Sequence, residues 1–415
     1  MTMAYVRRNR DSYGHIITAA CFSIQAVGVG TYICFGVFFT PLMEAFDWSR
    51  AAIAGASSAA FFITGLFGMM VGRLNDRIGP RLLMSIAAVF LGLGFALMSQ
   101  VSTLLQLYLV FGLVFGIGLS AVDVIALTTI ARWFSGNRGK MTGIVKVGTG
   151  AGQFFIPILA SVFIAAFGYQ TAFIILGFAA FALLMAIAQF LYRDPDIYDA
   201  GQAETAVPVA PVSGAVIRPV QTAGIDYSLA LKSPRLWLLC LSNLLLVFCL
   251  MSIMLHIVPY ARDMGIPPHR AAGVLATIGA VSMAGRFAGG LLIDRTGSKR
   301  IMILSFILLL IALFWLTRAD TLWELYAFAT VYGIAHGGFF TAISPIVAEL
   351  FGIRSHGGLF GIVVCFGTTG GALGPFVTGL MFDRFLNYAF AFSALILIAA
   401  IAFVLMLCLK TGPRA

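Results

Sequence analysis

The segment GRLNDRIGPR at residues 72–81 indicates the architecture of this chain, because a similar segment, GLLIDRTGSK, recurs at residues 290–299. The two copies are separated by 218 positions. The same offset relates four further residue pairs: Gly139 and Gly357, Gly143 and Gly361, Gly152 and Gly370, and Pro157 and Pro375. Several identities at one offset are typical of an internal repeat. We therefore predict that the chain consists of two similar halves.

The composition is that of a membrane protein. Of the 415 residues, 60% are hydrophobic and 10% are charged, and the mean hydropathy is +1.00. A helix needs about 20 apolar residues to cross a hydrocarbon layer of roughly 30 Å. Twelve such stretches are present, at approximately residues 16–43, 50–71, 82–101, 104–130, 139–167, 170–192, 236–262, 270–293, 299–318, 322–349, 357–383 and 387–410. They are continuously apolar, whereas the strands of a membrane β-barrel alternate, so we predict an all-α membrane protein with twelve transmembrane helices.

A polar segment rich in Pro, Ala and Gly separates the two halves at residues 193–235. Such a composition is typical of a linker. We predict an N-terminal six-helix bundle at residues 1–192, a cytoplasmic linker, and a C-terminal six-helix bundle at residues 236–415. Because each half has an even number of spans, both halves enter the membrane the same way up, and their pseudo-twofold axis lies along the membrane normal.

The basic residues predict the orientation, since Lys and Arg are retained on the cytoplasmic side of a membrane. With the N-terminus inside, 19 of the 26 Lys and Arg residues lie in cytoplasmic segments and five in outer loops. The remaining two, Lys146 and Arg286, lie within spans. We predict a multi-pass inner-membrane protein with both termini in the cytoplasm. The net charge of +10 then anchors the chain to the bilayer, and no nucleic-acid partner is needed to explain it.

Several other classes of protein are not indicated. The six cysteines fall in or at the ends of apolar spans without metal-ligand spacing, so we expect neither a metal site nor a cofactor. No nucleophile-base cluster appears, so we do not expect an enzyme. The first apolar stretch is longer than the core of a signal peptide and lacks a convincing cleavage site, so we expect it to remain as the first helix.

The repeated segment Gly-x-Leu-x-Asp-Arg-x-Gly resembles the signature loop of the major facilitator superfamily. The resemblance implies the major facilitator fold, with two pseudo-symmetric six-helix bundles. It also implies that the loop residues Asp76 and Arg77, and their second copies Asp294 and Arg295, form charge contacts with neighbouring helix ends and gate alternating access. An ordinary basic cytoplasmic loop is the alternative interpretation.

Longer segments resemble the monocarboxylate transporters and the neighbouring bacterial oxalate/formate exchangers. These segments are FGVFFTPLMEAFDWSRAAIAG (35–55), RWFSGNRGKMTGIVKVGTGAG (132–152), HIVPYARDMGI (256–266) and AGRFAGGLLIDRTG (284–297). The resemblance implies that Arg286 binds the substrate carboxylate and that the protein lies in a bacterial inner membrane. The sequence departs from the animal carriers at Ile33 and Ser282, where they have Lys and Asp. It also lacks the Lys of the oxalate exchangers in the span at 357–383.

Three charged residues, Asp123, Lys146 and Arg286, lie deep inside predicted spans, away from the span ends. Burying a guanidinium in a bilayer costs at least ~2.5–3.5 kcal/mol, so Arg286 needs a partner, and no acid lies near it in its own span. Its two-pronged donor suits a carboxylate; bonding to backbone carbonyls is the alternative. Asp123 and Lys146 are level with each other on consecutive spans, so we predict an ion pair. Two alternatives to the ion pair remain: Lys146 extends its side chain toward the cytoplasm, or burial keeps Asp123 neutral. In either charge state Asp123 is a candidate proton carrier.

Three further polar residues are weaker candidates for a cavity lining. The hydroxyl of Tyr32 can donate to a carboxylate, or the ring can be simply packed. His336 lines the cavity according to the family resemblance, or forms hydrogen bonds between helices as a neutral imidazole. His256 lies near the outer end of its span, where it is either a proton-coupling gate residue or structural.

These observations predict a secondary transporter of small monocarboxylates such as lactate or pyruvate, coupled to protons. Arg286, Tyr32, His336 and Lys146 are its predicted substrate-binding residues, and Asp123 and His256 its candidate proton-coupling residues. Exchange of a dicarboxylate, or of oxalate against formate, is the alternative. A channel does not need duplicated gating loops, and the short termini argue against a receptor. We expect the bilayer and the proton as partners and a single chain as the functional unit.

Overall fold

The computed structural model describes residues 2–195 and 224–410, and nearly all of them are helical. In chain order the longer elements are α1 (Thr2–Cys34), α2 (Phe39–Phe46), α3 (Arg50–Ile78), α4 (Pro80–Leu97), α6 (Gly116–Trp133), α7 (Arg138–Phe167), α8 (Tyr169–Ala188), α11 (Pro234–Asp263), α12 (Pro268–Thr296), α13 (Ser298–Leu316), α14 (Leu322–Phe351), α15 (His356–Phe385) and α16 (Ala389–Cys408). Twelve helical segments are long and apolar enough to cross a membrane, which confirms the twelve predicted spans.

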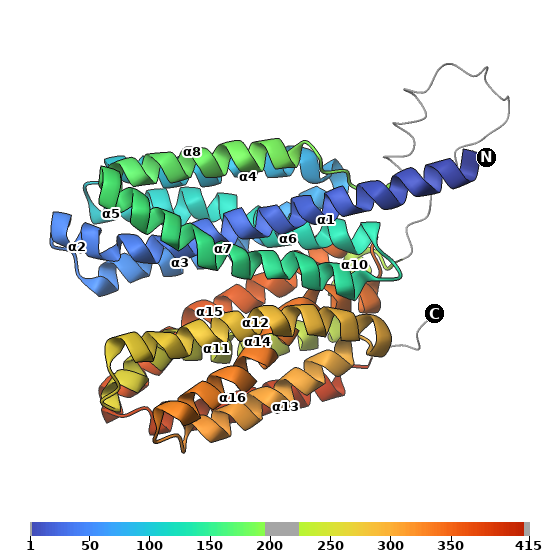
Figure 1. Ribbon diagram of the computed structural model, residues 1–415. Helices are drawn as coiled ribbons and strands as arrows, with labels where there is room; N and C mark the ends of the chain where they lie inside the picture. The colour runs from blue at the N-terminus through green and yellow to red at the C-terminus, as the bar shows by residue number, and fades with distance from the viewer. Residues whose placement is uncertain (1, 196–223, 411–415) are drawn as a thin grey trace.

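The helices form two groups. Figure 1 shows α1 to α8 together on one side and α11 to α16 on the other, with their axes running in roughly the same direction. Both chain ends lie at the same end of the molecule, which we call the terminal face; the other end is the opposite face. This is the predicted all-α arrangement of two six-helix bundles.

The predicted linker at residues 193–235 is described only at its two ends. Part of it, Tyr227–Leu231, forms a short helix, α10, at the terminal face, which the sequence analysis did not anticipate. Residues 224 and 225 pair with the segment between α14 and α15, since the Ile225 amide donates to the Phe351 carbonyl (2.9 Å). The exact boundaries between the bundles and the linker therefore remain a prediction.

Two predicted spans are less regular than the sequence suggested. The first is α1, a 3₁₀ turn at Phe35–Phe38 and then α2. The fourth is a turn at Leu104–Leu107, a π-helix at Tyr108–Phe115 and then α6. Aromatic packing joins the two irregular segments. The ring of Phe35, in the 3₁₀ turn, stacks on the ring of Phe111, in the π-helix, with the ring centroids 3.8 Å apart.

The two signature loops make the same turn. Gly79 ends α3 with φ of 97°, and Gly297, its counterpart at the offset of 218 positions, ends α12 with φ of 95°. Residues with a side chain rarely adopt such angles. The repeat detected in the sequence is therefore also a repeat of backbone conformation.

The two groups meet near the terminal face through backbone contacts between glycines. A Cβ atom added to Gly290 on α12 would lie 2.6 Å from the carbonyl oxygen of Gly139 on α7. The repeat-related contact joins Gly357 on α15 to Gly72 on α3, where an added Cβ would lie 2.5 Å from the carbonyl oxygen. Small residues allow helices in membranes to approach this closely.

We expect Gly290→Ala to lower the midpoint of thermal unfolding of the purified protein, because overpacking typically costs about 1–3 kcal/mol. Gly279→Ala is the matched control on the same helix, since an added Cβ there has nothing within 4 Å. Replacing a helical glycine with alanine otherwise stabilises by roughly 0.5–1 kcal/mol, so the control should be as stable as wild type or more so. Equal midpoints for the two variants would contradict the close contact.

Candidate functional site

A buried ion pair joins α6 and α7. The Nζ atom of Lys146 donates to Oδ1 of Asp123 over 2.5 Å, so the predicted pair is present. The two side chains differ in exposure, because that of Lys146 is 4% exposed and that of Asp123 is 35% exposed. The ammonium therefore points into the protein, not toward the membrane surface, while the carboxylate retains access to the space around it.

Gln25 on α1 completes this ion pair, and the sequence analysis missed it. Its Nε2 donates to Oδ1 of Asp123 (2.8 Å), while its Oε1 accepts from Lys146 Nζ (3.4 Å) and from the Thr149 hydroxyl (2.8 Å). Gln25 is fully buried. A carboxamide in a largely apolar first span was the signal for it, since a buried amide needs partners.

Arg286 on α12 lies beside this ion pair, and no carboxylate among the described residues forms a salt bridge with it. It is 2% exposed, and its Nη1 donates to the backbone carbonyl of Lys146 (3.3 Å). Its Nε is buried without a hydrogen-bond partner among the described residues. Asp123 is the acid whose charge acts on Arg286, and that acid already bonds Lys146. The guanidinium therefore keeps unused donor capacity in a buried position.

His336, on α14, lies near Arg286 and Lys146. Its ring centroid lies 4.9 Å from that of Phe340, and the charges of Arg286 and Lys146 both act on it. Both ring nitrogens are buried and have no hydrogen-bond partner in the described part of the chain. The alternative of an imidazole bonded between helices is thus not observed. Four helices, α6, α7, α12 and α14, bring Asp123, Lys146, Arg286 and His336 to one region, which with Gln25 on α1 we call the charged cluster.

The other two predicted polar residues lie elsewhere. The Tyr32 hydroxyl accepts from the Ser57 hydroxyl (3.1 Å), and its ring stacks on Phe61. The ring nitrogens of His256 contact the Tyr388 hydroxyl (3.1 Å) and the Pro375 carbonyl (2.9 Å). Within the described residues, no hydrogen bond or ring contact joins Tyr32 or His256 to the charged cluster. The roles of Tyr32 in substrate binding and of His256 in proton coupling stay predictions.

The signature-loop acids each cap a helix of the other bundle. Asp76, near the end of α3, accepts from the amides of Gly357 (3.0 Å) and Gly358 (2.8 Å) at the start of α15. Asp294, near the end of α12, accepts from the amides of Gly139 (2.6 Å) and Lys140 (2.8 Å) at the start of α7. Helix N-termini carry partial positive charge, so each carboxylate stabilises the contact between bundles.

The basic residues that follow these acids lie at the ends of the same helices. Arg77 and Arg295 lie in the last turns of α3 and α12, where a positive charge suits the helix dipole. The carbonyl of Arg77 accepts from Arg193 (3.5 Å). The N-terminal bundle adds an ion pair, since Arg132 donates to Asp76 over 2.7 Å. Leu350 occupies the position that corresponds to Arg132 in the second half of the chain, so the ion pair between Arg132 and Asp76 has no counterpart there.

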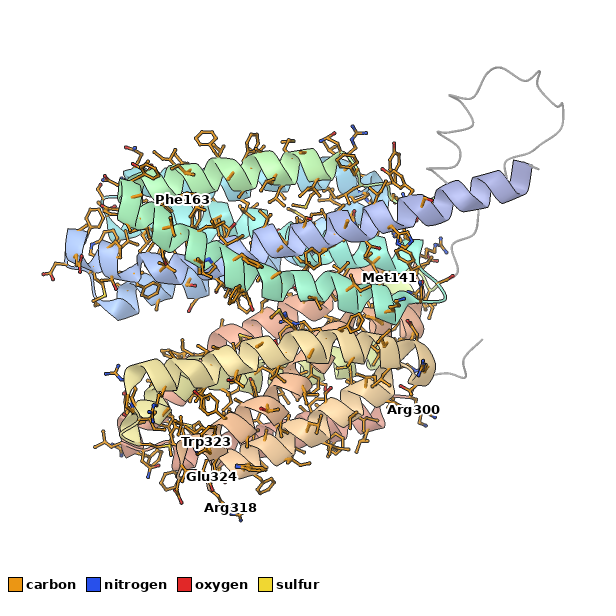
Figure 2. The ribbon with its side chains drawn as sticks, in the orientation of Figure 1. Met141, Phe163, Arg300, Arg318, Trp323 and Glu324 are labelled. Atoms are coloured by element: carbon orange, nitrogen blue, oxygen red, sulfur yellow. The ribbon has the colours of Figure 1, made fainter. Side chains whose placement is uncertain are left out.

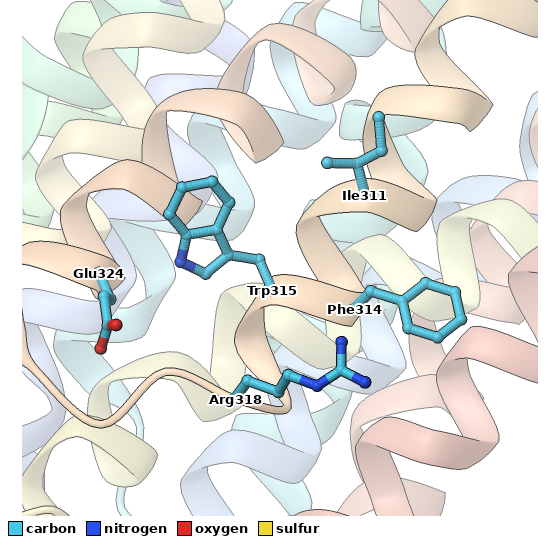
Figure 3. A pocket seen from close by; sticks show the side chains of 5 residues that line it. All are labelled: Ile311, Phe314, Trp315, Arg318 and Glu324. Atoms are coloured by element: carbon cyan, nitrogen blue, oxygen red, sulfur yellow. The ribbon is translucent and has the colours of Figure 1, made fainter.

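A groove of about 320 Å³ on the outer side of α13 is separate from the charged cluster. It is lined by Ile311, Phe314, Trp315, Arg318 and Glu324 (Figure 3). Figure 2 shows Arg318 and Glu324 at the edge of the C-terminal bundle, toward the opposite face. The Glu324 carboxylate accepts from the Thr321 amide and hydroxyl as a helix cap. The groove shares no residue with the cluster and is not the candidate site.

Comparison with known proteins finds membrane transporters that are similar over most of the chain. The chain is 26% identical over 407 residues to the agnestins efflux protein AgnL12 of Paecilomyces divaricatus, covering 96% of this chain and 88% of that protein. It is 23% identical over 417 residues to human monocarboxylate transporter 12, covering 94% and 80% of the two chains. The structure resembles that of the human organic anion transporter MFSD10, with a TM-score of 0.73, 14% identity and coverage of 95% and 99%.

The family assignment rests on most of the chain. The model of the Major Facilitator Superfamily matches residues 20–316 and 260–415. The twelve spans, the two helix groups and the repeated Asp-capped loops agree with that match. The chain belongs to the Major Facilitator Superfamily and is a multi-pass membrane transporter.

Proposed function

We propose that this transporter carries small monocarboxylate anions. One observation supports the proposal above all others: Arg286 is buried among helices with unused donors and, within the described part of the chain, without an acid of its own. A buried guanidinium is costly unless it is paired, and its planar donors match a carboxylate. A carboxylate substrate is therefore the natural partner of Arg286.

The charges of the cluster favour an anion with one negative charge. Asp123 and Lys146 neutralise each other across 2.5 Å, which leaves the single positive charge of Arg286. A monocarboxylate neutralises it, whereas a dicarboxylate leaves a buried excess charge. His336 can donate a hydrogen bond to a hydroxyl or keto group of a substrate such as lactate or pyruvate. The similarity to monocarboxylate transporter 12 supports the same substrate class.

The terminal-face contacts support an alternating-access mechanism. Asp76 and Asp294 hold the two bundles together there by capping helices across the bundle interface. We infer that breaking these caps, with Arg77 and Arg295 at the same helix ends, opens the terminal face while the opposite face closes. The residues of the charged cluster come from both bundles of a single chain, so one chain is the proposed functional unit.

We further infer that transport is coupled to protons through Asp123. It is the most exposed of the charged side chains in the cluster, and protonation would break its pair with Lys146. Symport of one proton with one monocarboxylate is electroneutral. Anion exchange is the second candidate, because the charge of Arg286 acts on Lys146, whose ammonium can offer a second cation.

We expect Arg286→Ala to abolish binding and Arg286→Lys to weaken it about 10- to 150-fold, because a lost charge-assisted bond costs about 1.5–3 kcal/mol. Binding of lactate, pyruvate, formate and oxalate is measured as thermal stabilisation of the purified protein. Arg318→Lys, on the groove of α13, is the matched control and should bind as wild type does. Ligand-induced stabilisation that survives in Arg286→Ala would refute the site.

We expect lactate uptake into proteoliposomes to rise when the outside is made acidic, because a proton gradient drives a symporter directly. Asp123→Asn should remove this response while binding at Arg286 persists. Exchange predicts a different result, in which uptake depends on an anion loaded inside and is insensitive to the pH gradient. Uptake of that kind in the wild-type protein would contradict proton symport.

We propose that the terminal face lies in the cytoplasm of a bacterial cell, with the protein in the inner membrane, because 19 of the 26 basic residues then lie inside. Labelling of single cysteines in a background without native cysteines checks this. Ser102→Cys, in the loop after α4, should react with an impermeant reagent in intact cells. Ser213→Cys, in the linker, should react only after permeabilisation; labelling of that residue in intact cells would overturn the orientation.

A further inference from the structure

We propose that Asp123 sets the charge of the anion that the site accepts. While Asp123 is ionised the site holds only a monocarboxylate, and when Asp123 is neutral the same site also accepts an anion with one more negative charge, a dicarboxylate. This inference rests on the proposed carboxylate site at Arg286, and it adds a second substrate class together with the residue that selects between the two.

The geometry makes Asp123 the one counter-ion of Lys146. Oδ1 of Asp123 accepts hydrogen bonds from Lys146 Nζ (2.5 Å) and from Gln25 Nε2 (2.8 Å). Among the described residues, no other carboxylate forms an ion pair with Lys146. Gln25 Oε1 accepts from the ammonium (3.4 Å), and the ring centroid of Phe340 lies 5.9 Å from Nζ. Neither carries a charge.

The side chains of Asp123 and Lys146 differ in how far they are exposed. The Asp123 side chain is 35% exposed, so a proton can reach its carboxylate, whereas the Lys146 side chain is 4% exposed and cannot withdraw its charge into water. A buried charge that loses its partner is strongly destabilised. Neutral Asp123 therefore leaves Lys146 in need of a new anion.

Once its counter-ion is neutral, Lys146 is a second cation beside Arg286. The charge of Arg286 acts on the Lys146 ammonium, and the charges of both residues act on His336. Arg286 Nη1 also donates to the backbone carbonyl of Lys146. The charged groups acting on Asp123 are Lys146 on α7 and Arg286 on α12, while α1 contributes the amide of Gln25 and α14 places His336 against the two cations. Neutralising Asp123 thus raises the charge of the cluster from one to two, which a dicarboxylate matches.

Propionate and succinate, which differ by one carboxylate, test this inference by calorimetric titration at neutral pH, where both groups of succinate are ionised. Asp123→Asn is isosteric and keeps the oxygen that accepts from Gln25. We expect it to raise the affinity for succinate relative to propionate by about 10- to 150-fold, the effect of one added charge-assisted bond. The double change Asp123→Asn with Lys146→Met restores a single cation and should return the ratio to the wild-type value.

The outcomes separate this inference from the proposed function. An unchanged ratio in Asp123→Asn, or a succinate preference that persists in the double variant, overturns the charge selection while Arg286-dependent propionate binding still stands. Propionate binding that survives in Arg286→Ala overturns the proposed function itself.

A measurement on the wild-type protein does not depend on the folding of any variant. Ethanesulfonate and 1,2-ethanedisulfonate stay ionised in acid, so their affinity ratio reports only the charge of the site. Acidification should shift the ratio toward the disulfonate as Asp123 takes up a proton, and the same shift in His336→Gln excludes a contribution from the imidazole. A ratio that does not change with pH would refute the inference.

Discussion

The cost of placing charge in an apolar medium governs the centre of this protein. Arg286, Lys146 and Asp123 lie on three helices from both bundles, and each needs a partner because lipid offers none. The ion pair of Lys146 with Asp123 meets that need within the N-terminal bundle. Arg286 is left with a backbone carbonyl and unused donors, so the imbalance of charge lies where the two bundles meet.

The interface between the two bundles depends on how closely the backbones of facing helices approach each other. The contacts between Gly139 and Gly290, and between Gly72 and Gly357, bring α7 against α12 and α3 against α15. This closeness lets a carboxylate on one bundle reach the first amides of a helix on the other. Both features obey the offset of 218 positions, so the pseudo-twofold relation is a property of the contacts as well as of the sequence. The Arg132 pair with Asp76 departs from it.

The sequence predicted the charged members of the site better than the neutral ones. A lone Arg, Lys or Asp in an apolar span is conspicuous, and level depth on consecutive spans was enough to pair Asp123 with Lys146. Gln25 was overlooked because an amide costs less to bury and its partners come from helices about 100 positions away. Depth along a helix does not reveal which neighbour a side chain faces, so the partners of Tyr32 and His256 outside the charged cluster could not be predicted.

The sequence by itself determined the twelve helices, the repeat and the residues able to carry charge within the membrane. Helix length and apolar content are local properties of the chain, and the membrane thickness fixes how many residues cross it. Only the tertiary structure decided which side chains meet. Helix rotation and tilt depend on packing against neighbouring helices, so contacts such as that of Arg286 with Lys146, 140 positions apart, arise only when the two bundles are assembled.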